Sequence, residues 1–524
     1  MSLIQLEQAL QPLRIPLTAV YLLALALLAT YGLHRYFLTM LFYRTRRYLP
    51  RRGRFTDLPP VTVQLPLFNE QHVAERIIEE ACKLDYPADK LQIQVLDDST
   101  DESAEIARRC AERMREQGHD VQYLHRTDRK GFKAGALREA LPHAKGQFIV
   151  VFDADFLPPH GFIKRTVHHF TDPKVGTVQT CWDHINRCDS VLTRCQAIFL
   201  DSHFLIEQTA RNRSGRWMNF NGTAGIWRRE AIETAGGWEH DTLTEDVDLS
   251  YRAQLAGWKF VYLPRVQCPA ELPPEIGAYK SQQHRWTKGS MQCALKLLPR
   301  IWKSPIPWPL KLEASLHLTS PLAYLCMVVI MLLFFPALFV NLAPLKEHTV
   351  AGTLWGIGLF LVTTCSAATF FVCSQTVRRR SWWRALAEVP FLMAIGLGMA
   401  LSNSRAVVEA IMGKQSDFIR TPKFRATGSD NSWRDRVSSV KLPPKKIVIA
   451  LELLMAAYLT FCCFIASLRL ESLVVTLPFL ILFASGYWYV GLHSLASELG
   501  WQRDDPGQPG GTTPTAPLEP AAQQ

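Results

Sequence analysis

The sequence lacks the cysteine patterns of a zinc-binding or disulfide-stapled fold. Its 12 cysteines are scattered over 524 residues, with no CxxC pair and no Cys/His spacing typical of metal ligands. We therefore expect reduced thiols that fill the core, as in a reducing compartment. We find no internal repeat either.

The charge of the chain is unbalanced, with 58 Lys and Arg against 47 Asp and Glu and a net charge of +11. Such a surplus raises the question of nucleic-acid binding. The basic residues, however, concentrate beside apolar segments, as the positive-inside rule describes for cytoplasmic loops of membrane proteins. Basic and aromatic residues are not interleaved in the polar part of the chain. We therefore expect membrane lipids as a partner and no nucleic acid.

Neither a pure membrane bundle nor one soluble globule fits the composition. At 48% hydrophobic and 20% charged residues, the chain is too polar for the first, and its apolar residues are too clustered for the second. The first apolar run covers residues 17–33, and six arginines without an acidic residue follow between Arg44 and Arg54. This asymmetry predicts a membrane helix with the following residues in the cytoplasm. A signal peptide is the alternative, disfavoured because the positive charge is concentrated after the apolar run.

Residues 59–299 alternate strand-like and helix-like segments. Such alternation predicts an α/β domain with a mostly parallel, doubly wound sheet. Ligands of such sheets bind beyond the carboxyl ends of the strands, and acidic residues stand at these ends here. The expected strands are 61–67, 93–96 and 148–152, and the expected helices are 72–84 and 103–117.

Long apolar segments follow, which predict a helical membrane region. An interfacial segment at 288–311 precedes them, and the expected spans after the first are 314–342, 349–377, 447–468 and 473–492. Basic residues flank the apolar piece 385–401 on both sides, so we expect an interfacial or re-entrant helix there, five crossings in total and a cytoplasmic C-terminus. The expected units are 1–58 (membrane helix and basic linker), 59–299 (catalytic domain), 300–498 (membrane region with a cytoplasmic loop at 403–446) and 499–524 (disordered tail).

Asp153 and Asp155 flank one residue at the end of a predicted strand. Two close carboxylates repel each other unless a cation lies between them. They are therefore candidate ligands of a divalent metal, Mg²⁺ or Mn²⁺, shared with a diphosphate. A solvated acidic turn is the alternative.

Two further groups suit a nucleotide. Asp97 and Asp98 end the preceding strand, where acids accept hydrogen bonds from ribose or base; a helix N-terminal acidic cluster is the alternative. Lys133 lies in a glycine-containing turn that suits a phosphate, although a charged surface loop would look the same.

The remaining candidates suit group transfer. Asp246, with Glu245 beside it, stands at a helix start and could take a proton from an acceptor hydroxyl, unless it belongs to an N-cap box. Gln282 and Arg285 share a helix face, on which Arg285 could grip a diphosphate. Trp286 could stack on a sugar ring. Membrane-interface Arg and Trp are the alternative, which the specific five-residue motif at 282–286 disfavours.

Taken together, these motifs resemble family 2 glycosyltransferases of the cellulose-synthase-like group, and look most like the plant mannan and glucan synthases. The resemblance rests on residues 64–70, 94–101, 133–138, 220–225 and 282–286. It implies a GT-A-type fold and inverting transfer. It further implies that Asp246 is the base and that Asp153 and Asp155 handle diphosphate and metal. Asn221, Gly222 and Thr223 would lie near the acceptor.

Residues 418–423 are similar to the FxVTxK gating loop of cellulose synthases. Arg420 replaces the expected valine, which puts loop gating in doubt, but Thr421 and Lys423 are present to contact a nucleotide. The tail shows no sign of a cyclic-di-nucleotide-binding domain.

The leading hypothesis is therefore a processive, inverting synthase. It would take UDP-glucose or GDP-mannose, extend a β-linked glucan or mannan and pass it through its spans, with accessory export subunits as further candidate partners. The alternative is a non-processive enzyme that adds one hexose to a membrane lipid. An inactive scaffold is disfavoured because every expected acidic position is occupied. We expect an inner or plasma membrane, or a Golgi-type membrane if the source is eukaryotic, with the catalytic domain in the cytoplasm.

Overall fold

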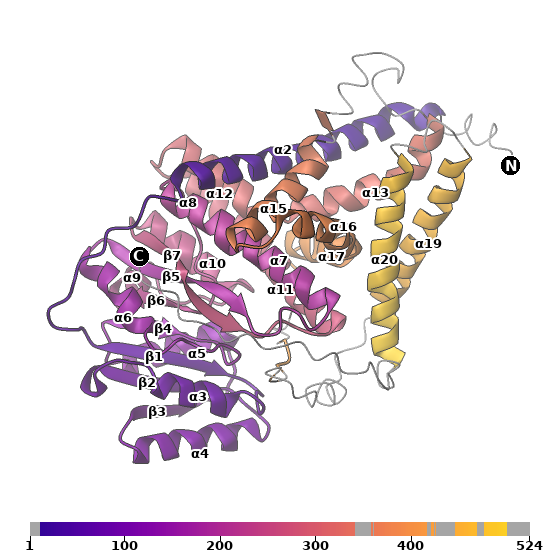
Figure 1. Cartoon of the computed structure of the whole chain (residues 1–524). Coiled ribbons are helices and arrows are strands. Elements are labelled where there is room, and N and C mark those ends of the chain that lie inside the picture. Colours follow the sequence, from indigo (N-terminus) through magenta and orange to yellow (C-terminus); the bar gives the residue numbers. More distant parts are fainter. Residues whose placement is uncertain are drawn as a thin grey trace.

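The computed structural model describes residues 11–340, 358–359, 361–416, 421–423, 425, 446–468 and 476–499. A sheet covered by helices occupies one end of the molecule, and long helices occupy the other (Figure 1). All 12 cysteines are free. The predicted tail after residue 499 and residues 418–420 of the gating-loop motif lie outside the described residues, as does most of the predicted loop 403–446.

The sheet has seven strands in the order β3-β2-β1-β4-β6-β5-β7. β1 is parallel to β2 and β4, β2 is parallel to β3, and β5 is parallel to β7. β6 is antiparallel to both of its neighbours. The predicted mostly parallel α/β sheet is therefore confirmed, with one reversed strand inserted. The strands are β1 Val61–Leu67, β2 Leu91–Asp97, β3 Asp120–His125, β4 Phe148–Val151, β5 Val175–His184, β6 Gly225–Arg228 and β7 Lys259–Ala270.

Both faces of the sheet are buried, as the alternation of side chains along β4 shows. Phe148 and Val150 join the core beneath α3 and α4, whereas Ile149 and Val151 join the core beneath α5, α9 and α10. The helices of this end are α3 Ala74–Cys82, α4 Ser103–Glu116, α5 Phe132–Ala140, α6 Phe162–Thr166, α7 Val191–Asp201, α8 Thr209–Arg213, α9 Arg229–Thr234 and α10 Glu245–Leu255. Short 3-10 turns are η1 Gln11–Leu13, η2 Ala88–Lys90, η3 Leu141–His143 and η4 Val167–Thr171, and η5 Ser202–Gln208 is a π-helix.

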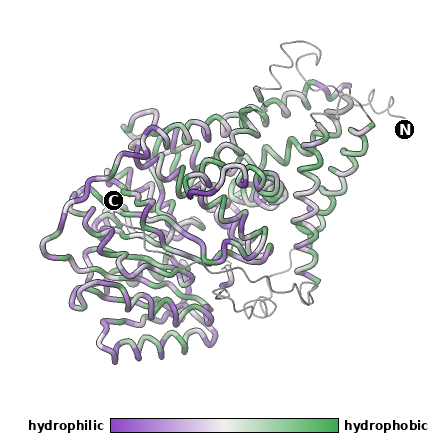
Figure 2. Tube along the Cα trace, in the orientation of Figure 1, coloured by the Kyte–Doolittle hydropathy of each residue, from purple (hydrophilic) through white to green (hydrophobic). Residues whose placement is uncertain are grey.

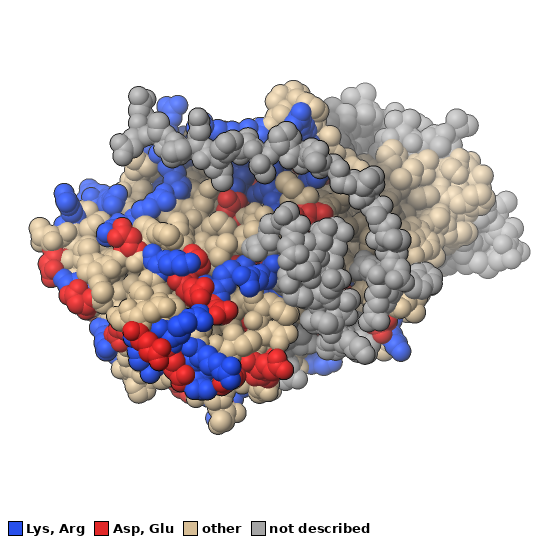
Figure 3. All heavy atoms as spheres, turned by 60° about the horizontal axis from the view of Figure 1, so that its bottom comes forward, with Lys and Arg blue, Asp and Glu red and all other residues tan. Residues whose placement is uncertain are grey.

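The outer surface around α4 is a solvated face of alternating charge. Figure 3 shows basic and acidic side chains interleaved over this end of the molecule. Arg108 pairs with Glu105 and Glu112 along the helix, and Arg113 reaches Glu75 and Glu79 of α3. Such exposed pairs contribute little to stability, but they keep the face soluble.

The other end consists of apolar helices (Figure 2). Among the described residues, three helices, within residues 11–45, 446–467 and 477–499, are long and apolar enough to cross a membrane. Up to five such spans result if each of two bent pairs, α12 with α13 (56°) and α16 with α17 (42°), is counted as one. The helices are α2 Arg14–Thr45, α11 Ile276–Lys303, α12 Trp308–Leu318, α13 Leu322–Val340, η6 Leu361–Cys365, α15 Ser366–Val377, α16 Trp382–Gly398, α17 Ala400–Ile411, α19 Lys446–Ser467 and α20 Thr476–Leu499.

The helices differ in detail from the predicted spans. The expected interfacial segment 288–311 is split, because α11 continues from the sheet end to Lys303 and α12 begins at Trp308. The piece 385–401 lies in the bent pair of α16 and α17. The number of crossings, their orientation and the unit boundaries stay predictions.

Candidate active site

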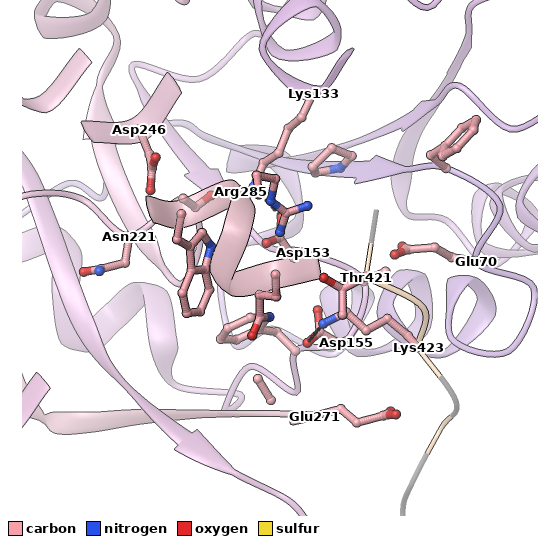
Figure 4. Close-up of a pocket in the computed structure, with 18 of the residues that line it drawn as sticks. Glu70, Lys133, Asp153, Asp155, Asn221, Asp246, Glu271, Arg285, Thr421 and Lys423 are labelled. Atoms are coloured by element: carbon pink, nitrogen blue, oxygen red, sulfur yellow. Dashed lines mark hydrogen bonds and ion pairs between the residues drawn. The ribbon is translucent and has the colours of Figure 1, made fainter. Parts of the chain in front are cut away.

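An open cavity lies at the carboxyl ends of β1 and β4 (Figure 4). Its wall comes from the segments that follow β1, β4 and β7, from the starts of α5 and α10, from one face of α11 and from residues 421 and 423. Segments far apart in sequence therefore meet at one place. The predicted site residues that line it are Asp98, Lys133, Asp153, Asp155, Asn221, Gly222, Glu245, Asp246, Gln282, Arg285, Trp286, Thr421 and Lys423.

Asp97 and Thr223, which we also predicted as substrate-binding residues, do not line the cavity. Asp97 is fully buried and accepts hydrogen bonds from the backbone N–H of Ser99 (2.9 Å) and the hydroxyl of Tyr123 (2.7 Å). The hydroxyl of Thr223 accepts a hydrogen bond from the backbone N–H of Asp153 (2.8 Å). Both side chains thus hold the turns that carry their cavity-lining neighbours.

Asp98 reaches the cavity already paired. Its two carboxylate oxygens accept hydrogen bonds from Nε and Nη2 of Arg126 at 2.7 and 2.6 Å, the bidentate geometry that arginine favours. Beside it, the guanidinium carbon of Arg129 lies 3.3 Å from the ring centroid of Phe68, and both residues line the cavity. This cation–π stack forms a flat wall of the kind that can contact a planar base.

The two carboxylates that follow β4 each face an ammonium group. Lys133 pairs with Asp153 and also donates to the carbonyl oxygen of Gly222 (2.9 Å). Lys423 pairs with Asp155 at 2.6 Å. Burial alone would lower the pKa of Lys133, but the carboxylates of Asp153 and Glu245 outweigh burial and raise it. Lys133 therefore stays positively charged in the cavity.

Asp153 and Asp155 suit a hard divalent cation. Carboxylate oxygens are the donors that Mg²⁺ and Mn²⁺ prefer, and Mg²⁺ commonly takes one or two carboxylates together with substrate phosphates. Two other acidic groups in the described part of the chain are each bridged by a cation. Arg113 lies between Glu75 and Glu79, and Lys296 contacts Asp248 at 2.9 Å.

Asp246 lies in the first turn of α10 and points into the cavity. Thr244, the residue before this helix, makes no side-chain capping hydrogen bond, so the N-cap box that we considered as an alternative is not formed. Burial, together with the negative charge of Glu245, raises the pKa of Asp246 to about 7, and the positive charge of Lys133 opposes this shift. A carboxyl group with this pKa can accept a proton near neutral pH.

Gly222 brings the backbone close to these groups. Its φ of +78° is in the left-handed region that favours glycine. A Cβ atom here would lie 3.3 Å from Oδ2 of Asp246 and 3.6 Å from Nζ of Lys133. The absence of a side chain therefore leaves the Asp246 carboxylate open to the cavity.

One face of α11 supplies Gln282, Arg285 and Trp286 to the cavity wall. The helix can approach α10 because of Gly289, where a Cβ atom would lie 2.9 Å from the backbone nitrogen of Thr244. Trp286 continues into an aromatic wall, with its ring 6.4 Å from that of Trp182. This wall can pack against the C–H face of a sugar ring.

Asn221 is oriented by side chains of the π-helix η5. Its Nδ2 lies 2.9 Å from Nε2 of His203, and its Oδ1 accepts a hydrogen bond from Gln208 at 2.6 Å. Its backbone N–H donates to Gln179 (3.0 Å). A π-helix frequently marks a functional site, and here it fixes a cavity-lining amide.

Sequence reasoning missed several lining residues. Glu70 stands in a motif to which we assigned no separate role, and the stack of Arg129 on Phe68 has no sequence signal. Trp182 and Glu271 lie near the ends of β5 and β7, so the rule that strand ends carry ligands would have indicated them had these strands been recognised.

The comparisons with known proteins agree with this geometry. Residues 59–289 match the family described as Glycosyltransferase like family 2. Over 238 residues the chain is 45% identical to the probable glucomannan 4-beta-mannosyltransferase 6 of Oryza sativa subsp. japonica, covering 44% of this chain and 42% of that protein. It is 41% identical over 251 residues to glucomannan 4-beta-mannosyltransferase 7 of Arabidopsis thaliana, covering 47% and 45%. The chain thus spans less than half the length of these curated relatives.

Among solved structures, a mannosyltransferase from Pyrobaculum calidifontis in complex with GDP-Man and Mn2+ is similar. Its TM-score is 0.50 at 24% identity, covering 76% of this chain and all of that one. The likeness shows the fold. The resemblance predicted from the motifs, and with it a GT-A-type domain of glycosyltransferase family 2, is confirmed for residues 59–289.

Proposed function

We propose that this protein is a membrane-embedded, inverting β-mannosyltransferase that extends a 1,4-linked mannan from GDP-mannose with a divalent metal. The observation that carries the proposal is the meeting of Asp155, Asp246 and Arg285 at one cavity. These residues come from three separate segments of the chain. The names of the plant relatives and of the GDP-Man complex favour mannose over glucose as the donor sugar.

Asp246 serves as the base in this proposal. As a hydroxyl oxygen of the acceptor attacks the anomeric carbon, the bond from that carbon to the diphosphate breaks and the hydroxyl proton moves to the Asp246 carboxylate. The pKa of about 7 keeps a sufficient fraction of this carboxyl deprotonated at neutral pH. Gly222 leaves the approach to the carboxylate open.

The leaving diphosphate gains negative charge, and cationic groups at the cavity stabilise it. Lys133 and Arg285 supply fixed positive charge, and Arg285 can form two parallel hydrogen bonds to phosphate oxygens. Asp153 and Asp155 would hold Mg²⁺ or Mn²⁺, which offsets the same charge when bound. Lys423, now paired with Asp155, adds a further ammonium group on this side.

Different lining residues of the cavity suit the two substrates. The Arg129–Phe68 stack and Asp98 suit the nucleoside of the donor. Trp286, Trp182 and Asn221 suit the terminal sugar of the acceptor, because indole rings pack on sugar C–H faces and the amide can bond a hydroxyl. An acceptor site beside the apolar helices supports repeated transfer to a polymer that leaves through the membrane region.

A donor screen with linkage analysis tests this function. Purified protein in detergent with Mn²⁺ is given GDP-mannose, UDP-glucose and other labelled sugar nucleotides. We expect mannose from GDP-mannose in a β-1,4-linked polymer. Transfer from UDP-glucose alone would contradict the donor, and a singly glycosylated lipid as the only product would contradict processivity.

A further inference from the structure

Helix α11 presents two different faces. Gln282, Arg285 and Trp286 face the cavity. Lys280, His284 and Lys288 recur at intervals of four residues, so they share another face, which we call the anchor face. The two lysines of the anchor face are buried, with 3% of the Lys280 side chain and none of the Lys288 side chain exposed.

The anchor face meets the membrane-region helices through ion pairs. Nζ of Lys280 lies 2.7 Å from Oε2 of Glu452 in α19 and donates to the hydroxyl of Ser494 in α20 at 3.2 Å. The Glu452 side chain is fully buried. Glu452 falls within a candidate membrane span, where an acidic residue is expensive unless it has a partner.

A second pair ties the same face to α17. Nζ of Lys288 and Nε2 of His284 each lie 3.2 Å from Oε2 of Glu409. At the beginning of α11, the hydroxyl of Ser497 in α20 donates to Glu275. The helix that carries Arg285 and Trp286 is thus attached to α17, α19 and α20 by polar contacts.

Ion pairs of this kind fix rotation as well as distance. A helix that packs only through apolar side chains can rotate slightly about its own axis, because many packing arrangements bury a similar apolar area. A buried ammonium group must stay within hydrogen-bond reach of its carboxylate, since separation would leave two uncompensated charges. The opposite face of the same helix, with Arg285 and Trp286, is then fixed as well.

We propose that Lys280 and Glu452 are positioning residues for the cavity, with Lys288 and Glu409 as a second tether. They hold α11 in the orientation about its axis in which Arg285 contacts the diphosphate and Trp286 contacts the acceptor. The inference rests on the proposed function, since it assigns those two ligands to the cavity. It adds that α19 and α20 help to set substrate affinity without touching substrate.

The double variant Lys280→Met with Glu452→Leu tests this role. It removes both charges and keeps the buried volume, so no unpaired charge remains and the chain should fold with a melting temperature near that of the wild type. We expect the acceptor KM and the Kd for GDP to rise about 10-fold, because one bidentate contact of Arg285 is worth about that factor. A merely structural role would lower the fraction of active protein. Neither KM nor Kd depends on that fraction, so a rise in both constants indicates a positioning role.

The matched control is Leu459→Ala in α19, a fully buried residue of the α19–α20 core. It weakens helix packing but leaves the Lys280–Glu452 pair intact, and we expect wild-type KM and Kd with a lowered melting temperature. A folded double variant with wild-type values of both constants would overturn the positioning role. If the wild-type protein transfers no sugar, the proposed function fails instead, and GDP binding still decides the tether.

Discussion

The pKa of the Asp246 carboxyl is set by opposing effects, and in the proposed reaction this pKa would determine the pH dependence of transfer. Burial and Glu245 raise its pKa to about 7, against the charge of Lys133. Only the deprotonated form accepts a proton, so kcat/KM should rise about tenfold per pH unit up to about pH 7 and level off above it. Initial rates with GDP-mannose at a series of pH values measure this profile. A rate independent of pH through this range would contradict the role of Asp246.

The same pKa shift predicts an effect on stability. The folded chain keeps the Asp246 proton up to about pH 7, whereas the unfolded chain loses it near 3.8. The folded state therefore binds the extra proton between these values, and the contribution of this group to the free energy of unfolding falls as pH rises from about 4 to 7. Asp246→Asn has no titratable group at this position, so its free energy of unfolding does not fall for this reason as pH rises. Its melting temperature relative to wild type should be higher at about pH 8 than at about pH 4, and the reverse order would refute the shift.

Lys133 should tune Asp246 as well as bind phosphate. Its positive charge lowers the pKa of Asp246, so Lys133→Met should move the midpoint of the pH–rate profile above 7 and weaken GDP binding. Lys145→Met, which removes an exposed lysine paired with Asp120, is the control and should leave both quantities unchanged. An unmoved midpoint in Lys133→Met would show that the lysine does not act on the base.

Some residues of the cavity could be predicted from the sequence, and others could not. Asp153, Asp155 and Asp246 could be identified because acids at the carboxyl ends of sheet strands and at nearby helix starts lie where such sheets bind their ligands. The sequence could not tell that Asp98 reaches the cavity while Asp97 does not. That choice depends on which face of the sheet each side chain takes at the end of β2, and successive side chains point to opposite faces.

Among the elements, the α/β alternation predicted β1, β2 and β4 and the helices α3 and α4. It did not predict β3 or α5, and Lys133, expected in a turn, lies at the start of α5. β7 was not recognised, since Pro264 and Pro269 lie within it and proline argues against a strand. β6 is short and antiparallel, which the alternation of strands and helices does not indicate. Glu271, which directly follows β7, was missed for the first of these reasons. Trp182 was missed because its strand, β5, was not predicted either.

The contact of α11 with the start of α10 depends on one glycine. A Cβ atom at Gly289 would lie 2.5 Å from Cγ2 and 2.9 Å from the backbone nitrogen of Thr244. Gly289→Ala should push α11 from Asp246, costing about 1–3 kcal/mol of stability and lowering kcat/KM. In Gly161→Ala, the nearest atom to the new Cβ is 3.8 Å away, so this control should match the wild type. The melting temperature and the initial rate are measured for both variants. Wild-type values of both quantities in Gly289→Ala would contradict the close contact.

For the whole molecule, hydropathy located the apolar helices but not their bends. The predicted span 314–342 turns by 56° between α12 and α13, and such a bend depends on the packing of neighbouring helices. Contacts between helices distant in sequence, such as α11 with α19, follow from packing in the same way. The residue pattern of one helix does not indicate which other helix packs against it.

The packing of α16 against α20 uses small residues at close range. A Cβ atom at Gly486 would lie 2.1 Å from the carbonyl oxygen of Ala394, as in small-residue contacts of membrane helices. Gly486→Val should therefore lower the melting temperature in detergent and the yield of monodisperse protein. In Gly358→Ala the new methyl group meets open space, so this control should keep the wild-type melting temperature and yield. Equal behaviour of the two variants would show that α16 and α20 are not closely packed.

The most direct measurement compares wild type with Asp246→Asn in one assay. Both proteins, purified in detergent with Mn²⁺, receive labelled GDP-mannose, and the label in β-mannanase-sensitive polymer is counted beside the Kd for GDP. We predict polymer from the wild type, a loss of about 100-fold or more in the variant, and GDP affinities within about threefold of each other. Equal polymer from both proteins, or none from the wild type, would contradict the account.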